Sequence, residues 1–420
     1  MSHATRKAGP LDRPWEYYLL DAIAKDSSHL VNLVVDRASA EISWQARVAE
    51  RYGRDRADEI HYLLSSFGLE WHVGDTLLQT ALLNDKRKAA SSLELAQRSI
   101  PDQVQHVAAE GTVQVALVQS ASDIGEVAAN LARLERHIRT AAEGGAKIVV
   151  LPETSVTGYL SQDLQTNWGL DGRPQSFPRT LDPTDYAETR DGTSVRRMAS
   201  LALELGVFIT VPYLEKEGER FFNSIALVGP GSQPENPALA HYRKNCPWPH
   251  PEKSWATPGE GVDESTFDTP YGRVGLAICF DIHSILDKYT DSGLWALLYP
   301  IAWVGNTTTW FAGELPDRLA RVNCPHYILG ANWATIAPQS WHGAGGSSAY
   351  GPGGRLLAHA TESRFRGCEE VVMLSIPTQD AMPQIGPLDR ERYQEWTREQ
   401  VGTDYWQRHT FEQLLATAHR

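Results

Sequence analysis

The stretch Tyr271–Ser284, YGRVGLAICFDIHS, carries the pattern that decides the fold. Its apolar run from Val274 to Ile278 is typical of a strand that is buried on both faces. Cys279 follows this run directly, and α/β folds hold reactive side chains rigidly at the ends of such strands. Because an unpaired cysteine is more often a small core residue, Cys279 is a candidate nucleophile only if other residues support it.

Two further apolar strands and a helix lie upstream of this stretch. VQVALVQ at 113–119 and KIVVL at 147–151 predict buried strands on either side of a helix at 123–143. A pair of glycines at 144–145 ends that helix. The β-α-β order predicts an α/β domain in which helices cover a sheet. Apolar strands, hairpins and helices continue in this way to residue 376.

The two ends of the chain differ from this central pattern. Apolar residues recur at helical spacing from 14 to about 98, with no strand pattern among them. The predicted organisation is a helical region at 1–110, an α/β domain at 111–376 and a polar tail at 377–420. We interpret the helical region as an extra layer packed on the main domain or on a neighbouring subunit. The alternative is a docking module for another protein.

Composition limits the classes of partner. The net charge of −13 over 420 residues argues against nucleic acid or an anionic membrane as a partner. The sequence has no run of eighteen apolar residues, and its first residues, MSHATRKAGPLDR, lack the apolar segment of a secretory signal. The four cysteines show neither metal-ligand spacing nor a disulfide framework. These features predict a cytoplasmic protein with free thiols and no bound metal.

Three polar residues stand where strands end or where a rigid loop begins: Glu153, Lys244 and Cys279. A nearby ammonium lowers the pKa of a thiol by favouring the thiolate. A carboxylate within reach takes the thiol proton and later delivers it to a leaving amine. A fixed lysine also stabilises an oxyanion. Together the three supply a base, an electrostatic stabiliser and a nucleophile, although each alone has an ordinary structural explanation.

The segments around these residues resemble those of the carbon–nitrogen hydrolase (nitrilase) superfamily. The matching segments, in chain order, are IVVLPE (148–153), HYRKNCPWPHPE (241–252) and AICFDI (277–282). The resemblance covers about 113–376 and implies a four-layer α-β-β-α sandwich. It also implies a catalytic triad of Glu153, Lys244 and Cys279 that works without a metal or an organic cofactor.

Finer features of the resemblance narrow the substrate class. The loop at 241–252 looks like that of aliphatic amidases, in which a second glutamate, here Glu252, helps to position the substrate and to hold the lysine and cysteine. The alternative is an exposed loop carboxylate. CFDI, YPIAWVGN and HGAGGSSAYGP are closer to the pantetheinase and biotinidase branch, whose substrates are N-substituted amides. The residues after Cys279 do not match the Cys-Trp-Glu of true nitrilases, which favours an amide over a nitrile.

The resemblance also implies residues that contact the substrate. Tyr159 and Trp303 occupy positions that line the cleft in relatives, although each is equally explained as a core aromatic. The backbone N–H of Phe280 would help to hold an oxyanion. His283 lies close enough in sequence to Cys279 to suggest a catalytic cysteine–histidine pair, but we predict that His283 is structural or lines the pocket.

Three other polar residues near these segments are predicted to be structural. Asp281 is expected to cap the helix that follows it. Asn223 and Ser347 fall in family-like segments, FNS and GSSAYGPGG, and are expected to hold strands and turns together.

The sequence therefore predicts a cysteine-dependent hydrolase of small non-peptide amides. The runner-up activities are a nitrilase and an acyl transferase that uses the same thioester. A hypothesis of another class is a scaffold that recruits a partner through its N-terminal helices. Relatives commonly dimerise, so we expect a homodimer or a higher homo-oligomer, in which the aromatic residues of the tail, Trp396, Tyr405 and Trp406, make subunit contacts.

Overall fold

A computed structural model describes residues 110–159, 166–168, 174–176, 183–248, 252, 255–303, 308–334, 345–360 and 369–401. The chain divides into the units Met1–Leu95 and Ala96–Arg420, and every described residue belongs to the second unit. The helices predicted before residue 110, together with Tyr405 and Trp406, lie outside the described residues. Within the described ranges, no helix is long and apolar enough to cross a membrane.

The first of two mixed sheets has the strand order β14-β1-β2-β5-β6-β7. Its strands β1, β2 and β5 are parallel, and the other pairs are antiparallel. In this sheet β14, from the far end of the domain, pairs with β1. The strands are β1 (Thr112–Gln119), β2 (Ile148–Val150), β5 (Phe208–Glu217), β6 (Arg220–Val228), β7 (Ala240–Arg243) and β14 (Glu370–Pro377).

The second sheet has the order β13-β12-β11-β10-β9-β8, and its central strands β9, β10 and β11 are parallel. The strands are β8 (Thr266–Thr269), β9 (Gly272–Leu276), β10 (Ala296–Pro300), β11 (Tyr327–Ala331), β12 (Ser348–Tyr350) and β13 (Leu356–His359). A separate antiparallel pair is formed by β3 (Thr166–Trp168) and β4 (Pro174–Ser176).

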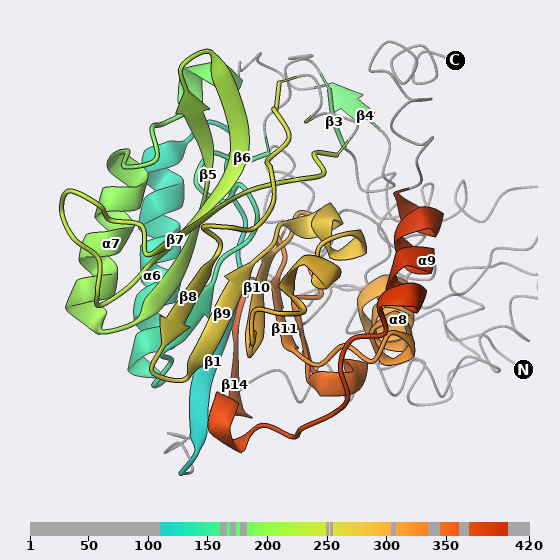
Figure 1. Cartoon of the computed structure of the whole chain (residues 1–420). Coiled ribbons are helices and arrows are strands. Elements are labelled where there is room, and N and C mark those ends of the chain that lie inside the picture. Colours follow the sequence, from blue (N-terminus) through green and yellow to red (C-terminus); the bar gives the residue numbers. More distant parts are fainter. Residues whose placement is uncertain are drawn as a thin grey trace, which may run out of the picture. The chain divides into compact units, whose positions relative to one another are not determined.

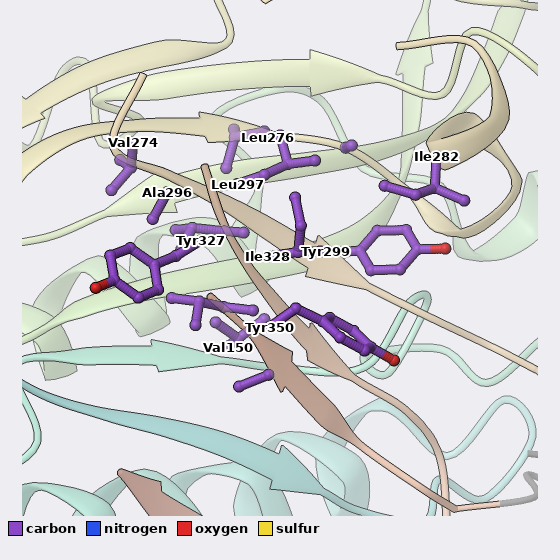
Figure 2. Packing of buried hydrophobic residues seen from close by; sticks show 14 of the residues in the cluster. Val150, Val274, Leu276, Ile282, Ala296, Leu297, Tyr299, Tyr327, Ile328 and Tyr350 are labelled. Carbon is purple, nitrogen blue, oxygen red and sulfur yellow. The ribbon is translucent and has the colours of Figure 1, made fainter. Parts of the chain in front are cut away.

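The main hydrophobic core contains buried residues from both sheets. Val150 of the first sheet belongs to the same cluster as Leu297 and Ile328 of the second, and Figure 2 shows all three among the packed side chains. Strand β1 illustrates how alternation builds two layers, because Val115 belongs to this core whereas Val118 belongs to a second cluster on the opposite face. The central strands β1 and β2 are therefore buried on both faces, as their nearly continuous apolar sequences predict.

Two helices cover the outer face of the first sheet. The helices α6 (Val127–Glu143) and α7 (Thr193–Leu205) lie side by side there (Figure 1) and pack Leu134 and Met198 into the second cluster. Gly206 ends α7 with a φ of 66°, a left-handed conformation that glycine adopts without strain.

The helices α8 (Leu315–Arg321) and α9 (Arg390–Gln400) contact each other beside the second sheet (Figure 1). The other helical segments among the described residues are short 3-10 turns, apart from η5, which is a seven-residue π-helix. They are η1 (Pro183–Tyr186), η3 (Cys279–His283), η4 (Leu286–Tyr289), η5 (Thr308–Glu314), η6 (Pro352–Gly354) and η7 (Gln379–Ala381).

The described residues confirm the predicted α/β class with two sheets and covering helices. The segment after the cysteine forms a short 3-10 turn, η4, at Leu286–Tyr289. One local prediction is wrong. The strand that precedes Cys279 ends at Leu276, and the cysteine opens η3 instead of ending the strand.

Candidate active site

Three of the predicted site residues lie just after the ends of strands. Glu153 comes three residues after β2, Lys244 comes directly after β7, and Cys279 comes three residues after β9. Hydrogen bonds from or to other segments hold the backbone of two of these residues. The indole N–H of Trp333 donates to the Glu153 carbonyl, and the Lys244 N–H donates to the Asn223 carbonyl at 2.8 Å.

The structure brings Glu153, Lys244 and Glu252 into direct contact. The Lys244 Nζ lies 2.7 Å from Glu153 Oε1 and 2.5 Å from Glu252 Oε2. All three residues are at most 1% exposed. The backbone N–H of Trp248 also donates to Glu252 Oε2 at 2.7 Å, which ties the lysine loop to this carboxylate. Glu252 is therefore a buried partner of the lysine and not the exposed loop carboxylate of the alternative interpretation.

Asn223 lies in the same cluster, a role that sequence reasoning missed. Its Nδ2 donates to Glu153 Oε1 at 2.8 Å and to Glu252 Oε1 at 2.5 Å. The segment FNS carried the signal, but alternation along β6 alone does not show that residue 223 faces two acids. Ser347, in contrast, binds Gln119 and holds adjacent segments together, as predicted.

One oxygen of Glu153 remains available for chemistry. Oε1 accepts hydrogen bonds from Lys244 and Asn223, whereas the buried Oε2 has no hydrogen-bond partner among the described residues. Burial raises the pKa of Glu153 to about 7, with the Lys244 charge opposing this shift and the Glu252 charge adding to it. A carboxyl group with such a pKa can both accept and return a proton near neutral pH.

The Lys244 ammonium is held in its charged form. Burial opposes its charge, but the two carboxylates of Glu153 and Glu252 outweigh burial and raise the pKa of Lys244 well above its ordinary value. Lys244 therefore acts as a fixed positive charge and not as a base.

Cys279 carries a thiol in the resting site. Burial and the Glu153 charge raise the pKa of Cys279 well above its ordinary value, although Lys244 and a backbone hydrogen bond from Ala302 favour the thiolate. Lys244 lowers the pKa of Cys279, as expected, but two carboxylates balance the ammonium charge, so the net shift is upward and no thiolate is preformed. The thiol has to lose its proton during attack, and Glu153 is the base close to it.

The backbone at Cys279 is strained. Its φ is 43°, in the left-handed region that residues with a Cβ rarely adopt. The Cys279 carbonyl accepts a hydrogen bond from the Tyr299 hydroxyl at 2.5 Å, which helps to fix this turn. Such strain persists only where surrounding contacts hold it, and it is common at reactive residues.

Asp281 joins the lysine loop to the cysteine turn. Its Oδ1 accepts from the Cys246 N–H at 2.8 Å, and its Oδ2 accepts from the Tyr242 hydroxyl at 2.7 Å. Burial raises the pKa of Asp281 to about 6, against the Lys244 charge and these hydrogen bonds. Contrary to the prediction, Asp281 does not cap the following turn. Its Oδ2 also accepts from the Ile278 N–H at 3.4 Å, at the start of η3 to which Asp281 itself belongs, and its shorter bonds reach across to β7 and the loop after it.

Tyr159 and Trp303, both predicted to contact substrate, differ in burial and in their neighbours. Tyr159 is buried against the acids, and burial, the charges of Glu252 and Glu153, and a hydrogen bond with Glu252 raise the pKa of Tyr159 well above its ordinary value. Trp303 is partly buried and stacks on Trp310 with ring centroids 5.4 Å apart.

Phe280 and His283 lie within one aromatic group. The Phe280 ring contacts that of His283 at 4.8 Å and that of Trp248 at 4.9 Å. His283 Nδ1 accepts from the indole N–H of Trp396 at 2.9 Å. Trp396, expected in subunit contacts, is 3% exposed and is therefore buried within its own chain.

No metal site accompanies this cluster in the described part of the chain. Among those residues, no group of three or more histidine, cysteine, aspartate or glutamate side chains is arranged to hold a metal ion. Three cysteines, Cys246, Cys279 and Cys324, are free there.

The chain is similar in sequence to known carbon–nitrogen hydrolases. The family model for carbon-nitrogen hydrolase matches residues 114–378. The omega-amidase NIT2 of Homo sapiens is 31% identical over 258 residues, which are 59% of this chain and 82% of that protein. The Danio rerio omega-amidase NIT2 is 28% identical and covers 63% of this chain and 88% of its own length.

Solved structures give the same fold. An amidase of the nitrilase superfamily from Nesterenkonia AN1 matches 69% of this chain and 96% of its own with a TM-score of 0.53 and 19% identity. A variant of that amidase carries the acetamide moiety of fluoroacetamide covalently at its active-site cysteine, and it matches with the same TM-score.

Proposed function

This chain belongs to the carbon-nitrogen hydrolase family, and from that premise we propose that Glu153, Lys244 and Cys279 hydrolyse a small non-peptide amide through a thioester. The observation that carries the proposal is the free, buried Oε2 of Glu153, whose pKa of about 7 suits a group that accepts and returns protons. The products are a carboxylic acid and ammonia or an amine.

The first half of the reaction forms the acyl-enzyme. The Cys279 sulfur attacks the amide carbonyl carbon while its proton passes to Glu153. The developing oxyanion is held by the Lys244 ammonium and by the Phe280 N–H. The tetrahedral intermediate then breaks its C–N bond, and the nitrogen leaves with the proton from Glu153. The thioester on Cys279 remains.

The second half releases the acid. Glu153, ionised again, takes a proton from a water molecule as that water attacks the thioester carbonyl. The C–S bond breaks, the carboxylic acid leaves and the sulfur recovers a proton from Glu153. Each cycle consumes one amide and one water, and the enzyme returns to its starting protonation state.

Glu252 and Asn223 position this machinery. Glu252 holds the ammonium together with Glu153, and Asn223 links the two carboxylates by donating to both. We propose that Tyr159, which hydrogen-bonds Glu252, lines the acyl pocket. We place Trp303 and His283 near the same site as candidate pocket residues.

The substrate class follows from the relatives and the cysteine segment. The curated relatives are named omega-amidases, which supports a substrate with its amide at the end of a short chain. The segment after Cys279 is Phe-Asp-Ile, which favours amide over nitrile. Nitrile hydrolysis and acyl transfer remain the alternatives.

Product analysis separates these activities. With an amide, we expect free acid and an equal amount of ammonia. Acid formed from a nitrile but not from the matching amide would favour the nitrilase, and a new amide formed when an amine is supplied would favour the transferase. The control is Cys279→Ala, which should lack every one of these products.

The layer arrangement, cellular location and assembly of the enzyme are also proposals. We infer a four-layer α-β-β-α sandwich with a helical region at 1–110, a cytoplasmic location and assembly as a homodimer or higher oligomer. A fragment that starts near Val113 and is active would assign the first region to partners or assembly. Light scattering that shows a monomer at micromolar concentration would exclude the oligomer.

A further inference from the structure

Helix α9 is bonded to the turn that carries Cys279, although 107 or more residues of chain separate the partners. The Tyr393 hydroxyl donates to the Ile282 carbonyl at 2.8 Å and accepts from the Leu286 N–H at 3.0 Å. The Trp396 indole N–H donates to His283 Nδ1 at 2.9 Å.

Tyr393 fixes the backbone after the nucleophile. Its single oxygen bridges the end of η3 and the start of η4, and Ile282, Leu286 and Tyr393 are all fully buried. Without this hydroxyl, one buried carbonyl and one buried N–H would have no partner among the described residues. The two turns would then have to shift to recover hydrogen bonds.

Trp396 fixes the orientation of the His283 ring. Because Nδ1 accepts from the indole, the ring proton belongs on Nε2. Burial and the Arg318 charge lower the pKa of His283 to about 3, so the ring is neutral at working pH. The ring then packs against Phe280, the residue that follows Cys279. Its contacts thus suit a spacer between α9 and the nucleophile turn better than a proton carrier.

The turn needs such support from outside. Cys279 is held at a φ of 43°, and η3 contains only five residues, so the turn has few hydrogen bonds of its own. A strained residue relaxes unless its neighbours over-determine it. Tyr299 holds the Cys279 carbonyl from β10, and α9 holds the opposite end of the turn.

We propose that Tyr393 and Trp396 are positioning residues that hold the Cys279 sulfur and the Phe280 N–H in the geometry of attack. This proposal rests on the proposed function, in which Cys279 is the nucleophile. It assigns the segment at 390–400 to the catalytic apparatus through contacts within one chain. These two residues act through the turn and are not themselves required to touch substrate.

The test compares Tyr393→Phe and Trp396→Phe with a matched control. Tyr393→Phe removes only the hydroxyl, and Trp396→Phe removes the indole N–H and leaves a smaller aromatic ring. Tyr213→Phe is the control, because it also removes a buried hydroxyl, here bonded to His241, in the cluster between the first sheet and its helices. We measure kcat and KM with a small amide, the melting temperature and the folded fraction of each variant.

We expect both α9 variants to lower kcat about tenfold with KM within about twofold, since a small displacement of a reacting group has effects of this size. Tyr213→Phe should lower the melting temperature but keep kcat. If kcat per folded molecule in both α9 variants equals that of Tyr213→Phe, the positioning proposal is wrong. Should Tyr393→Phe not fold, Trp396→Phe decides the question alone, because the smaller phenylalanine ring fits within the space of the indole without a clash.

Different results would overturn the proposed function and the positioning role. Full activity in Cys279→Ala would overturn the proposed function itself. An inactive Cys279→Ala together with unchanged kcat in the α9 variants would overturn only the positioning role. A further readout is the tautomer of His283, measured by nitrogen NMR. The wild type should show an unprotonated Nδ1 whose chemical shift reflects its hydrogen bond. In Trp396→Phe the Nδ1 chemical shift should change, because that hydrogen bond is lost.

Discussion

The Asn223 amide nitrogen lies 2.8 Å from Glu153 Oε1, the same oxygen that accepts from Lys244. Both donors therefore occupy one oxygen of the carboxylate and leave Oε2 without a partner among the described residues. The two oxygens of Glu153 therefore have different roles. Oε1 anchors the glutamate, and Oε2 is available to exchange a proton with the thiol, the leaving nitrogen and water.

Removing the Asn223 amide should weaken this anchor. Asn223→Ala is expected to lower kcat by about 10- to 100-fold, because hydrogen bonds to charged groups contribute about 1.5–3 kcal/mol. Since Asn223 lowers the pKa of Glu153, its loss should also move the acid limb of the pH profile upward. Ser224→Ala is the control, because Ser224 bonds Glu215 on the other face of β6. Equal kcat in the two variants would show that Asn223 does not support catalysis.

The pH dependence of kcat/KM should report Glu153. The base must be ionised for attack, and burial raises its pKa to about 7. Activity should therefore fall about tenfold per pH unit well below pH 7 and level off above it. A profile that stays flat from pH 5 to 8 would contradict this assignment. Glu153→Gln should lose about 10²- to 10⁴-fold in rate.

Neutralising Glu252 should lower both the plateau rate and the pKa of Glu153. Its charge raises the pKa of Glu153, so Glu252→Gln should shift the acid limb of kcat/KM to lower pH. The rate plateau should nevertheless fall, by roughly 10- to 100-fold, because Lys244 loses one of its two carboxylates and sits less firmly. A limb that moves to higher pH would show that Glu252 does not act on Glu153 through its charge.

The thiol of Cys279 should alkylate slowly at neutral pH. Burial and Glu153 raise the pKa of Cys279 well above its ordinary value, and iodoacetamide reacts with the thiolate. The rate, followed by mass spectrometry of the Cys279 peptide, should still be rising with pH above 9. A plateau below pH 7 would instead indicate a preformed thiolate. The corresponding peptide of Cys279→Ala serves as the blank.

Local sequence patterns predicted most of the central fold. The strands around 113–119 and 147–151 were identified because they are apolar on both faces, and the first begins one residue earlier in the structure, at Thr112. The pairing of β14 with β1 was not predictable, because it joins segments over 250 residues apart. Strand β7 was missed, since its sequence AHYR contains only one strongly apolar position of strand type.

The site was predicted unevenly for physical reasons. Glu153, Lys244 and Cys279 were found through three sequence segments, each of which carries its own pattern. The role of Asn223 depends on which face of β6 it occupies relative to two distant carboxylates, and no local pattern encodes that distance. The high pKa of the thiol was also hidden, because it results from the sum of burial and three charges.

The most direct test of the central claim is intact mass spectrometry of the protein during turnover of a small amide, quenched in acid. We predict a species heavier by the acyl group, located on the Cys279 peptide and missing from Cys279→Ala. Turnover that continues in Cys279→Ala, or an adduct located on any other residue, would contradict the proposed thioester mechanism.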